Sequence, residues 1–313
     1  MRITRRELVI LPSMWSILQL GGCLKQNGDD LNGEGRTNRN PVYLLVAGSL
    51  LTAIERGMKN KIEIPLRVEA HGSVAIAQLV KDGLKNPDVI SVSDPILFER
   101  LIEPKWHVEF AANQMVVAYN KNTDGGKLVA KGGEEKWYEP ILRNNIKIGR
   151  TDPDLDPLGY RALFLLELAE LYYEKINLKK EILSKSWVFP EIELMSYFEI
   201  GGIDAAIVYK NMAVERGYDY IELPLEINLS SPEKVNDWYS KVRYKLNSGE
   251  IVRGDVIKYG STIWSEEFDA AIVNVFEEHI KGNYLREFGF YIPEAYPKIV
   301  GDVPDGIEGV LDR

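Results

Sequence analysis

Two short segments near the start of the chain, each predicted to be a strand, lead into a glycine and a serine at the beginning of a helix. Val42–Ala47 is followed by Gly48-Ser49, and Leu66–Ala70 is followed by His71, Gly72 and Ser73. Val42–Ala47 is continuously apolar, which is typical of a strand buried on both faces of a parallel sheet. Repetition of this unit predicts an open α/β sheet, and such sheets bind ligands at the carboxyl ends of their strands.

Strands and helices alternate along the rest of the chain, so the predicted fold class is α/β. The apolar run 110–120 is long enough to leave one lobe and enter another, and residues 220–224 offer a return crossing. We therefore expect two lobes of discontinuous chain. Residues 41–116 and 221–313 would form the first lobe, and residues 117–220 the second.

The stretch 149–161 packs three aspartates and two prolines in front of a strongly apolar helix. Asp156 stands where an N-cap belongs, and Pro157 takes the first helical position, where a missing N–H costs nothing. A helix start of this kind presents free backbone N–H groups and a partial positive charge, which suits oxyanions. The alternative is that Asp152, Asp154 and Asp156 merely cap and solubilise a turn.

The first residues are typical of an export signal, residues 1–22, with a basic head and an apolar segment too short to span a bilayer permanently. The small residues before Cys23 resemble a lipobox, in which Cys23 would become the lipidated N-terminus. The alternative is an ordinary cleavable signal with an incidental cysteine. Residues 23–40 are polar and rich in Gly, Asn and Asp, which predicts a flexible tether. We expect the protein to work outside the cell.

Composition excludes several kinds of partner and site. The net charge of −9 disfavours a nucleic-acid partner bound through a basic surface. A single cysteine rules out an intramolecular disulfide and a cysteine-based zinc site, and three scattered histidines argue against a histidine-rich metal centre. The 313 residues suffice for two lobes with cores of their own.

Several segments, taken together and in this order, resemble the archaeal molybdate/tungstate-binding lipoproteins, the extracellular component of an ABC importer. The segments are 47–50, 72–74, 149–161, 203–210 and 251–260. The resemblance covers residues 42 to 300, and its most specific part is the run from Asp156 to Arg161. It implies the two-lobed periplasmic-binding-protein fold (type II), with the ligand held in a cleft between the lobes.

The resemblance also implies a set of ligand contacts, which is carried over position by position. The expected contacts are Gly48, Ser49, Ser73, Leu155, Asp156, Pro157, Glu191 and Tyr209. Two departures from the family pattern occur: the helix between Ser49 and Ser73 and the segment between Asp156 and Glu191 are both short. Glu193 is therefore the alternative to Glu191 as the second carboxylate.

Carboxylates are unusual in an anion site, because each repels a bound dianion by a few kcal/mol at an effective dielectric of ~20. Mo(VI) and W(VI) are hard Lewis acids that can accept further oxygen ligands. The resemblance implies that Asp156 and Glu191 coordinate the metal of the oxyanion and raise it towards six-coordination. The expected ligand is tungstate or molybdate, with no cofactor.

The resemblance further implies a monomeric binding protein that delivers its ligand to a membrane permease and ATPase, held at the membrane by a lipid anchor. One alternative keeps the binding role but changes the ligand to sulfate or phosphate. A second alternative is a Mg²⁺-dependent phosphoryl-transfer enzyme built on Asp152, Asp154 and Asp156. The chain lacks an accompanying P-loop or histidine dyad, so we expect no enzyme.

Overall fold

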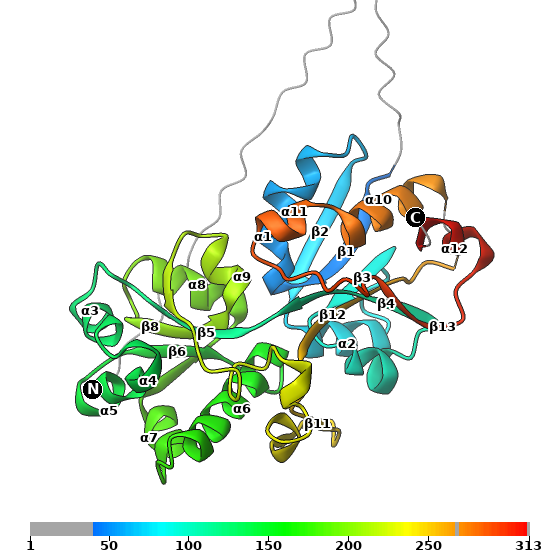
Figure 1. The fold of residues 1–313 in the computed structure, drawn as a ribbon. Coiled ribbons are helices and arrows are strands. Elements are labelled where there is room, and N and C mark those ends of the chain that lie inside the picture. The colour runs from blue at the N-terminus through cyan, green and yellow to red at the C-terminus, as the bar shows by residue number, and fades with distance from the viewer. Residues whose placement is uncertain (1–39, 267–268, 312–313) are drawn as a thin grey trace, which may run out of the picture. The chain divides into compact units, whose positions relative to one another are not determined.

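The computed structural model describes residues 40–266 and 269–311, which belong to one compact unit (Figure 1). The predicted signal 1–22 and Cys23 lie outside the described residues, and of the tether 23–40 only Asn40 is described. Within the described part of the chain, no helix combines the length and the apolar character that a membrane crossing requires.

The first sheet has six strands in the order β13-β4-β12-β3-β1-β2. β1 runs parallel to β2 and β3, whereas β12 is antiparallel to β3 and β4. Leu44, Leu45 and Val46 of β1 are fully buried, as expected for a central strand covered on both faces. The strands are β1 Val42–Ala47, β2 Leu66–His71, β3 Val89–Val92, β4 Trp106–Asn113, β12 Ile257–Ile263 and β13 Lys298–Gly301.

The second sheet has five strands in the order β7-β6-β8-β5-β9. β6 is parallel to β7 and β8, and β5 is antiparallel to β8 and β9. Its strands are β5 Met115–Tyr119, β6 Ile148–Thr151, β7 Ser186–Phe189, β8 Ala205–Tyr209 and β9 Asp219–Ile221. The apolar strand β8 lies within segment 203–210 of the resemblance, and its residues are all buried.

Two connections join the sheets. The expected crossing at 110–120 consists of β4 and β5 with only Gln114 between them, and Figure 1 shows the chain passing from one sheet to the other there. The return connection follows β9 and lies beside the first, because Met115 N–H donates to the Asn228 carbonyl. It then reaches β12, where Ile257 N–H donates to the Leu229 carbonyl.

Helices pack beside both sheets. In the first half of the chain they are α1 Leu51–Arg56, α2 Ser73–Lys81, α3 Asp124–Ala130, α4 Gly133–Lys136, α5 Tyr138–Arg143 and α6 Pro157–Tyr172. In the second half they are α7 Leu178–Lys185, α8 Glu191–Glu199, α9 Lys210–Val214, α10 Ala270–Lys281, α11 Tyr284–Glu287 and α12 Asp305–Leu311.

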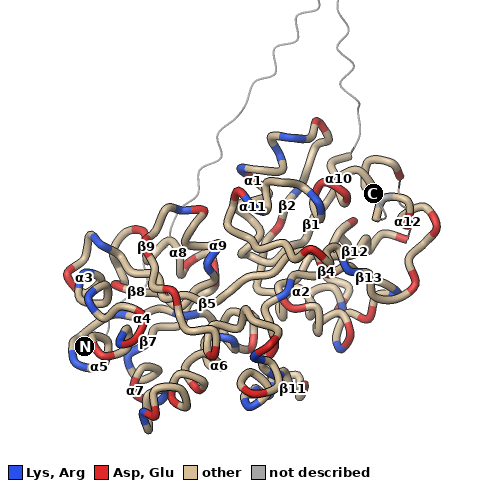
Figure 2. Tube along the Cα trace, in the orientation of Figure 1, with Lys and Arg blue, Asp and Glu red and all other residues tan. Residues whose placement is uncertain are grey.

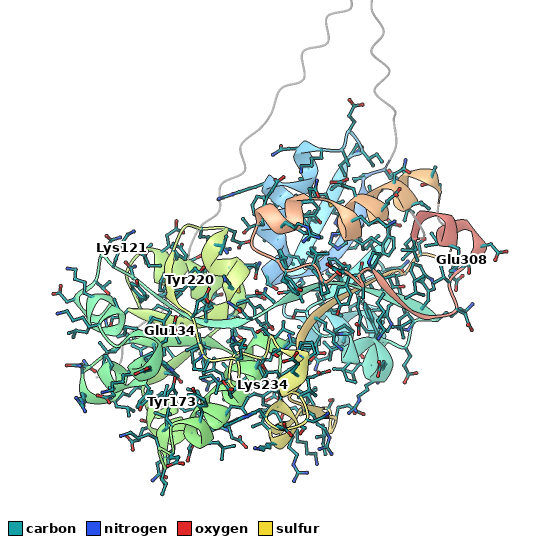
Figure 3. The ribbon with its side chains drawn as sticks, viewed as in Figure 1. Lys121, Glu134, Tyr173, Tyr220, Lys234 and Glu308 are labelled. Carbon is teal, nitrogen blue, oxygen red and sulfur yellow. The ribbon has the colours of Figure 1, made fainter. Side chains whose placement is uncertain are left out.

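Two stretches of polar composition are helical. Residues 124–136 hold α3 and α4, and Tyr173 ties α4 to the end of α6 by donating to the Glu134 carbonyl (Figure 3). Residues 178–184 lie in α7, which buries Leu178 and Ile182 one turn apart. In both cases, a few apolar residues at helical spacing outweigh the polar composition.

The predicted lobe limits, 41–116 with 221–313 and 117–220, stay a prediction. The segment between β9 and β12 contacts elements of both sheets and carries a hairpin of β10 Arg243–Lys245 and β11 Ile251–Arg253. The Trp238 ring lies 5.8 Å from that of Tyr172 in α6, and Arg100 donates to the Ile251 carbonyl at 2.7 Å. Acidic and basic residues are interspersed along the loops around both sheets (Figure 2).

Candidate functional site

A cavity of about 420 Å³ lies where β1, β2 and β6 end at their carboxyl ends. Gly48 follows β1, Gly72 follows β2, and Thr151 is the last residue of β6. Four of the predicted contacts line this cavity: Gly48, Leu155, Asp156 and Glu191. Residues from elements of both sheets therefore meet here, at the edge where α/β sheets bind ligands.

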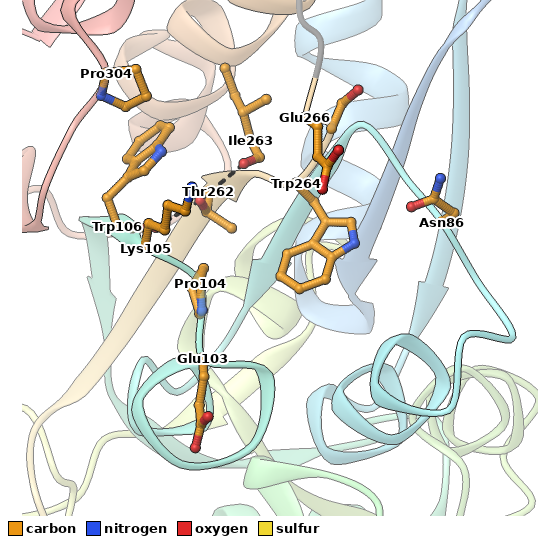
Figure 4. Close-up of a pocket in the computed structure, with 11 residues that line it drawn as sticks. Asn86, Glu103, Pro104, Lys105, Trp106, Thr262, Ile263, Trp264, Glu266 and Pro304 are labelled. Atoms are coloured by element: carbon orange, nitrogen blue, oxygen red, sulfur yellow. Dashed lines mark hydrogen bonds between the residues drawn. The ribbon is translucent and has the colours of Figure 1, made fainter.

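A second cavity of about 690 Å³ lies at the opposite edge of the first sheet (Figure 4). It is lined by Trp106 at the start of β4 and by Ile263 and Trp264 at the end of β12. None of the polar side-chain atoms left buried and unpartnered in the described residues belongs to its lining. The smaller cavity has three such atoms, on Thr151, Asp156 and Glu191, so it is the better candidate for a polar ligand.

Asp156 is the N-cap of α6, as predicted. Its backbone is extended, its Oδ1 accepts the Leu158 N–H at 2.9 Å, and Pro157 opens the helix. The side chain is 3 % exposed, and Oδ2 has no hydrogen-bond partner among the described residues. An N-cap needs only one carboxylate oxygen, so the second oxygen is available to a ligand.

Glu191 is the first residue of α8 and is 7 % exposed. A Cβ built at Gly48 would overlap its Oε2, so only glycine at 48 permits this approach of the carboxylate. Oε1 of Glu191 lacks a partner within the described chain. Glu193, the alternative, also lines the cavity but is exposed to solvent.

The two carboxyl groups resist carrying charge together. Burial raises the pKa of Asp156 to about 6, against favourable hydrogen bonding from Leu158 N–H. Burial, followed by the charge of Asp156, raises the pKa of Glu191 well above its usual range. Two buried carboxyls in this arrangement hold a proton between them unless a positive centre joins them.

Four predicted contacts do not line the cavity: Pro157, which opens α6, and three residues with hydroxyl groups. Ser49, Ser73 and Tyr209 are buried, and each hydroxyl oxygen accepts a hydrogen bond. Ser49 Oγ accepts from Tyr259 at 3.0 Å, Ser73 Oγ from the Ser93 N–H at 3.0 Å, and Tyr209 from Arg161 Nη1 at 2.8 Å. The charges of Asp156 and Glu191 contribute to raising the pKa of Tyr209, after burial, so Tyr209 lies close to both carboxyls.

Two residues beside this cluster escaped the sequence reasoning, although both stand in the stretch 149–161. Arg161 is buried; its Nη2 lies 3.1 Å from Asp94 Oδ2 and its Nη1 donates to the Ser93 carbonyl at 2.5 Å. Thr151 Oγ1 is buried beside Asp156 and has no hydrogen-bond partner in the described residues. Arg161 falls five residues after the cap. The residues that it contacts depend on how the two sheets pack together, which this spacing does not reveal.

The other two aspartates of the stretch shape its loop. Asp152 Oδ1 accepts the Asp154 N–H at 2.9 Å. Asp154 accepts hydrogen bonds from the Tyr244 hydroxyl and the Asn247 N–H, both at 2.9 Å, and so anchors the β10–β11 hairpin. Within residues 40–266 and 269–311, no group of three His, Cys, Asp or Glu side chains is placed to hold a metal ion. This arrangement does not fit the Mg²⁺ alternative.

Residues 42–272 match the family described as bacterial extracellular solute-binding protein. A Haloferax volcanii protein, named as an ABC transporter molybdenum-binding protein, is 40% identical over 277 residues, which cover 86% of this chain and 88% of that one. A molybdate/tungstate-binding protein of Thermococcus kodakarensis is 27% identical over 333 residues, with 93% of this chain and 92% of that protein covered.

The solved structure of the Azotobacter vinelandii periplasmic molybdate-binding protein is similar with a TM-score of 0.55 at 13% identity. The match covers 81% of this chain and all of that one, and it confirms the two-lobed, type II periplasmic-binding-protein fold. Solute binding, not catalysis, is the role in the family's description, in agreement with the prediction that the chain is no enzyme. The chain belongs to the family of bacterial extracellular solute-binding proteins.

Proposed function

We propose that this protein captures tungstate or molybdate outside the cell and delivers it to an ABC importer. The observation that carries the proposal is the pair of buried carboxyls, Asp156 and Glu191, each with an unpartnered oxygen beside the same cavity. Sulfur and phosphorus in their oxyanions take no further oxygen ligands, so sulfate or phosphate could meet this pair only through a shared proton and not through coordination. The metal of tungstate or molybdate can accept both carboxylates. The names of the Haloferax and Thermococcus relatives support this ligand class.

The remaining predicted residues take roles around that pair. Ser49 and Tyr209 would donate to the oxo atoms, because a hydroxyl that already accepts a hydrogen bond keeps its proton for a ligand. Ser73 also contacts the Ser93 hydroxyl at 3.2 Å, and it would donate to an oxo atom when Ser93 is the donor in that contact. The backbone at Gly48, Leu155 and Pro157 would form the wall of the site. Elements of both sheets supply these groups, so ligand binding would favour the state in which the two lobes are shut.

The partners and location follow from the same role. We propose that the protein presents its ligand to a membrane permease with its ATPase, and that it acts as a monomer. Cys23 would carry a lipid anchor, with residues 23–40 as the tether between membrane and binding body. The family's description as extracellular supports a location outside the cell.

Titration calorimetry on the full chain tests the ligand. Tungstate and molybdate should bind with submicromolar affinity, and sulfate and phosphate should bind at least about a hundredfold more weakly, because they cannot accept the two carboxylates. Tight binding of sulfate or phosphate, with no heat from tungstate, would replace our ligand by the alternative oxyanion.

A matched pair of variants tests the second carboxylate. Glu191→Ala should weaken tungstate binding by about a hundredfold or more, because it removes a buried ligand to the metal. Glu193→Ala changes a carboxylate of the same helix turn that is exposed, and it should leave the dissociation constant within about twofold. The reverse result would move the second carboxylate from Glu191 to Glu193.

A further inference from the structure

Ser49 is connected to a chain of buried polar side chains that runs to the junction of the two sheets. Tyr259 on β12 donates to Ser49 Oγ at 3.0 Å, and Asn113 at the end of β4 donates to the Tyr259 oxygen at 3.2 Å. Asn211, in the first turn of α9, accepts from Asn113 at 2.7 Å and donates to the Ser49 carbonyl at 2.7 Å. All four residues are buried, and we call them the Ser49 chain.

Backbone groups fix the orientation of both amides in the Ser49 chain. The Gln114 N–H, which can only donate, bonds Asn113 Oδ1 at 2.9 Å, so the amide nitrogen of Asn113 must face Tyr259 and Asn211. The Ser49 carbonyl, which can only accept, holds the amide nitrogen of Asn211. The Tyr259 oxygen therefore accepts a hydrogen bond from Asn113. Ser49 Oγ is the other hydrogen-bond partner of this hydroxyl among the described residues, and the Tyr259 proton is donated to it.

This direction determines whether Ser49 can donate a hydrogen bond to a ligand. A hydroxyl has one proton, and with Tyr259 donating to its oxygen, Ser49 keeps that proton for another acceptor. Tyr209 is set in the same way, because the guanidinium of Arg161 can only donate to its oxygen. Neither hydroxyl proton has an acceptor among the residues that the structure describes. The two sheets thus each contribute a hydroxyl whose free proton suits a fully deprotonated oxyanion.

We propose that Tyr259 is a positioning residue that makes Ser49 an obligate hydrogen-bond donor to the bound oxyanion, with Asn113 holding Tyr259 in that role. The inference rests on the proposed function, because it needs an oxyanion beside Ser49. Tyr259 also packs against the ring of Phe290, with centroids 5.1 Å apart, so its hydroxyl can be removed while the ring stays. Tyr259→Phe is therefore the informative change.

A double-mutant cycle on the full chain separates positioning from general stability. Tyr259→Phe should raise the dissociation constant for tungstate by about tenfold, because Ser49 Oγ loses the donor that directs its proton. In the Ser49→Ala background the same change should alter the constant by less than about twofold, since no hydroxyl remains to be directed. Both constants are read from calorimetric titrations with sodium tungstate.

Tyr284→Phe is the matched control. Tyr284 is also a fully buried tyrosine, and its hydroxyl donates to the His279 carbonyl at 2.9 Å, away from the cavity. The control should lower the melting temperature about as much as Tyr259→Phe while leaving tungstate affinity unchanged. A purely structural Tyr259 would instead behave like this control.

A wrong positioning role and a wrong proposed function would give different results. If the wild-type chain binds tungstate and Tyr259→Phe either leaves the affinity unchanged or weakens the Ser49→Ala variant as much as the wild type, the positioning role is wrong and the proposed function stands. If the wild-type chain binds neither tungstate nor molybdate, the proposed function is wrong and the inference is overturned with it.

Discussion

At the scale of single residues, the site is defined by two carboxyls that are costly to ionise where they lie. Burial raises the pKa of both Asp156 and Glu191. A carboxyl whose pKa is higher in the folded than in the unfolded chain stabilises the fold only while it is protonated. Ionisation of these carboxyls at neutral pH therefore lowers the free energy of unfolding of the unliganded protein, and a bound metal centre would offset this loss.

This penalty predicts a pH dependence of stability. The free energy of unfolding of the unliganded wild type should fall as pH rises from the ordinary carboxyl range through about 6. Asp156→Asn keeps an N-cap but cannot ionise. Over this pH interval its free energy of unfolding should therefore rise relative to that of the wild type by on the order of 3 kcal/mol. Urea unfolding at pH about 3 and about 7.5, on either side of both pKa values, measures the difference. A constant offset between the two proteins would contradict the shifted pKa.

Gly48 gives a second prediction at this scale. Gly48→Ala should displace the Glu191 carboxylate, because the new Cβ would overlap it, and should weaken tungstate binding by about tenfold or more. The clash falls on the end of a side chain and not on the backbone, so the melting temperature should change little. Gly309→Ala is the control, since a Cβ there meets no atom within 4 Å. Equal affinities for all three proteins would refute the close approach.

At the scale of elements, α6 organises the site because its first two turns face both sheets. Asp156 caps it, and Arg161 reaches from it to the Ser93 carbonyl and the Asp94 carboxylate after β3. Tyr160 of the same turn donates to Asp94 at 2.6 Å. The start of one helix thus positions the Asp156 carboxylate in the site and connects the lobe of the second sheet to that of the first.

Removing the charge of Arg161 should be far more damaging than removing that of a surface arginine. Arg161→Met leaves Asp94 partly buried without its cation, which should lower the free energy of unfolding by roughly 3–5 kcal/mol. Arg143→Met removes an exposed arginine from its pair with the partly buried Glu139 and should cost less than about 1 kcal/mol. Urea denaturation of both variants checks the ranking, and similar losses would show that burial does not strengthen the Arg161 contact.

The sequence carried enough information to predict elements whose signals are local. The apolar run of β1, the Asp156-Pro157 cap of α6 and the crossing near residue 114 needed only pattern and propensity. The unpartnered hydroxyl of Thr151, the reach of Arg161 and the Ser49 chain depend on contacts between residues 48 to 210 positions apart, as from Ser49 to Tyr259. No local pattern encodes those contacts, and the family resemblance named Ser49 and Tyr209 without their partners.

At the scale of the whole described body, ligand binding and stability should be linked. Tungstate at about a hundred times its dissociation constant should stabilise the folded chain by about 2.7 kcal/mol and raise its melting temperature by about 5 °C. The shift should disappear in Asp156→Ala, which loses both the cap and a metal ligand. Scanning calorimetry with and without sodium tungstate measures it, and an undiminished shift in the variant would remove Asp156 from the site.

Gln114 alone separates β4 from β5, and its N–H also orients Asn113, the first amide of the Ser49 chain. Asn211, at the start of α9, belongs to the other side of that junction. Turning one sheet against the other about Gln114 would therefore pull Asn211 away from Asn113 and from the Ser49 carbonyl, while Asn113, Tyr259 and the Ser49 hydroxyl stay together on the first sheet. The motion that opens the way out would thus also detach the loop carrying Ser49 from the second sheet, and release of the bound oxyanion would need no separate trigger.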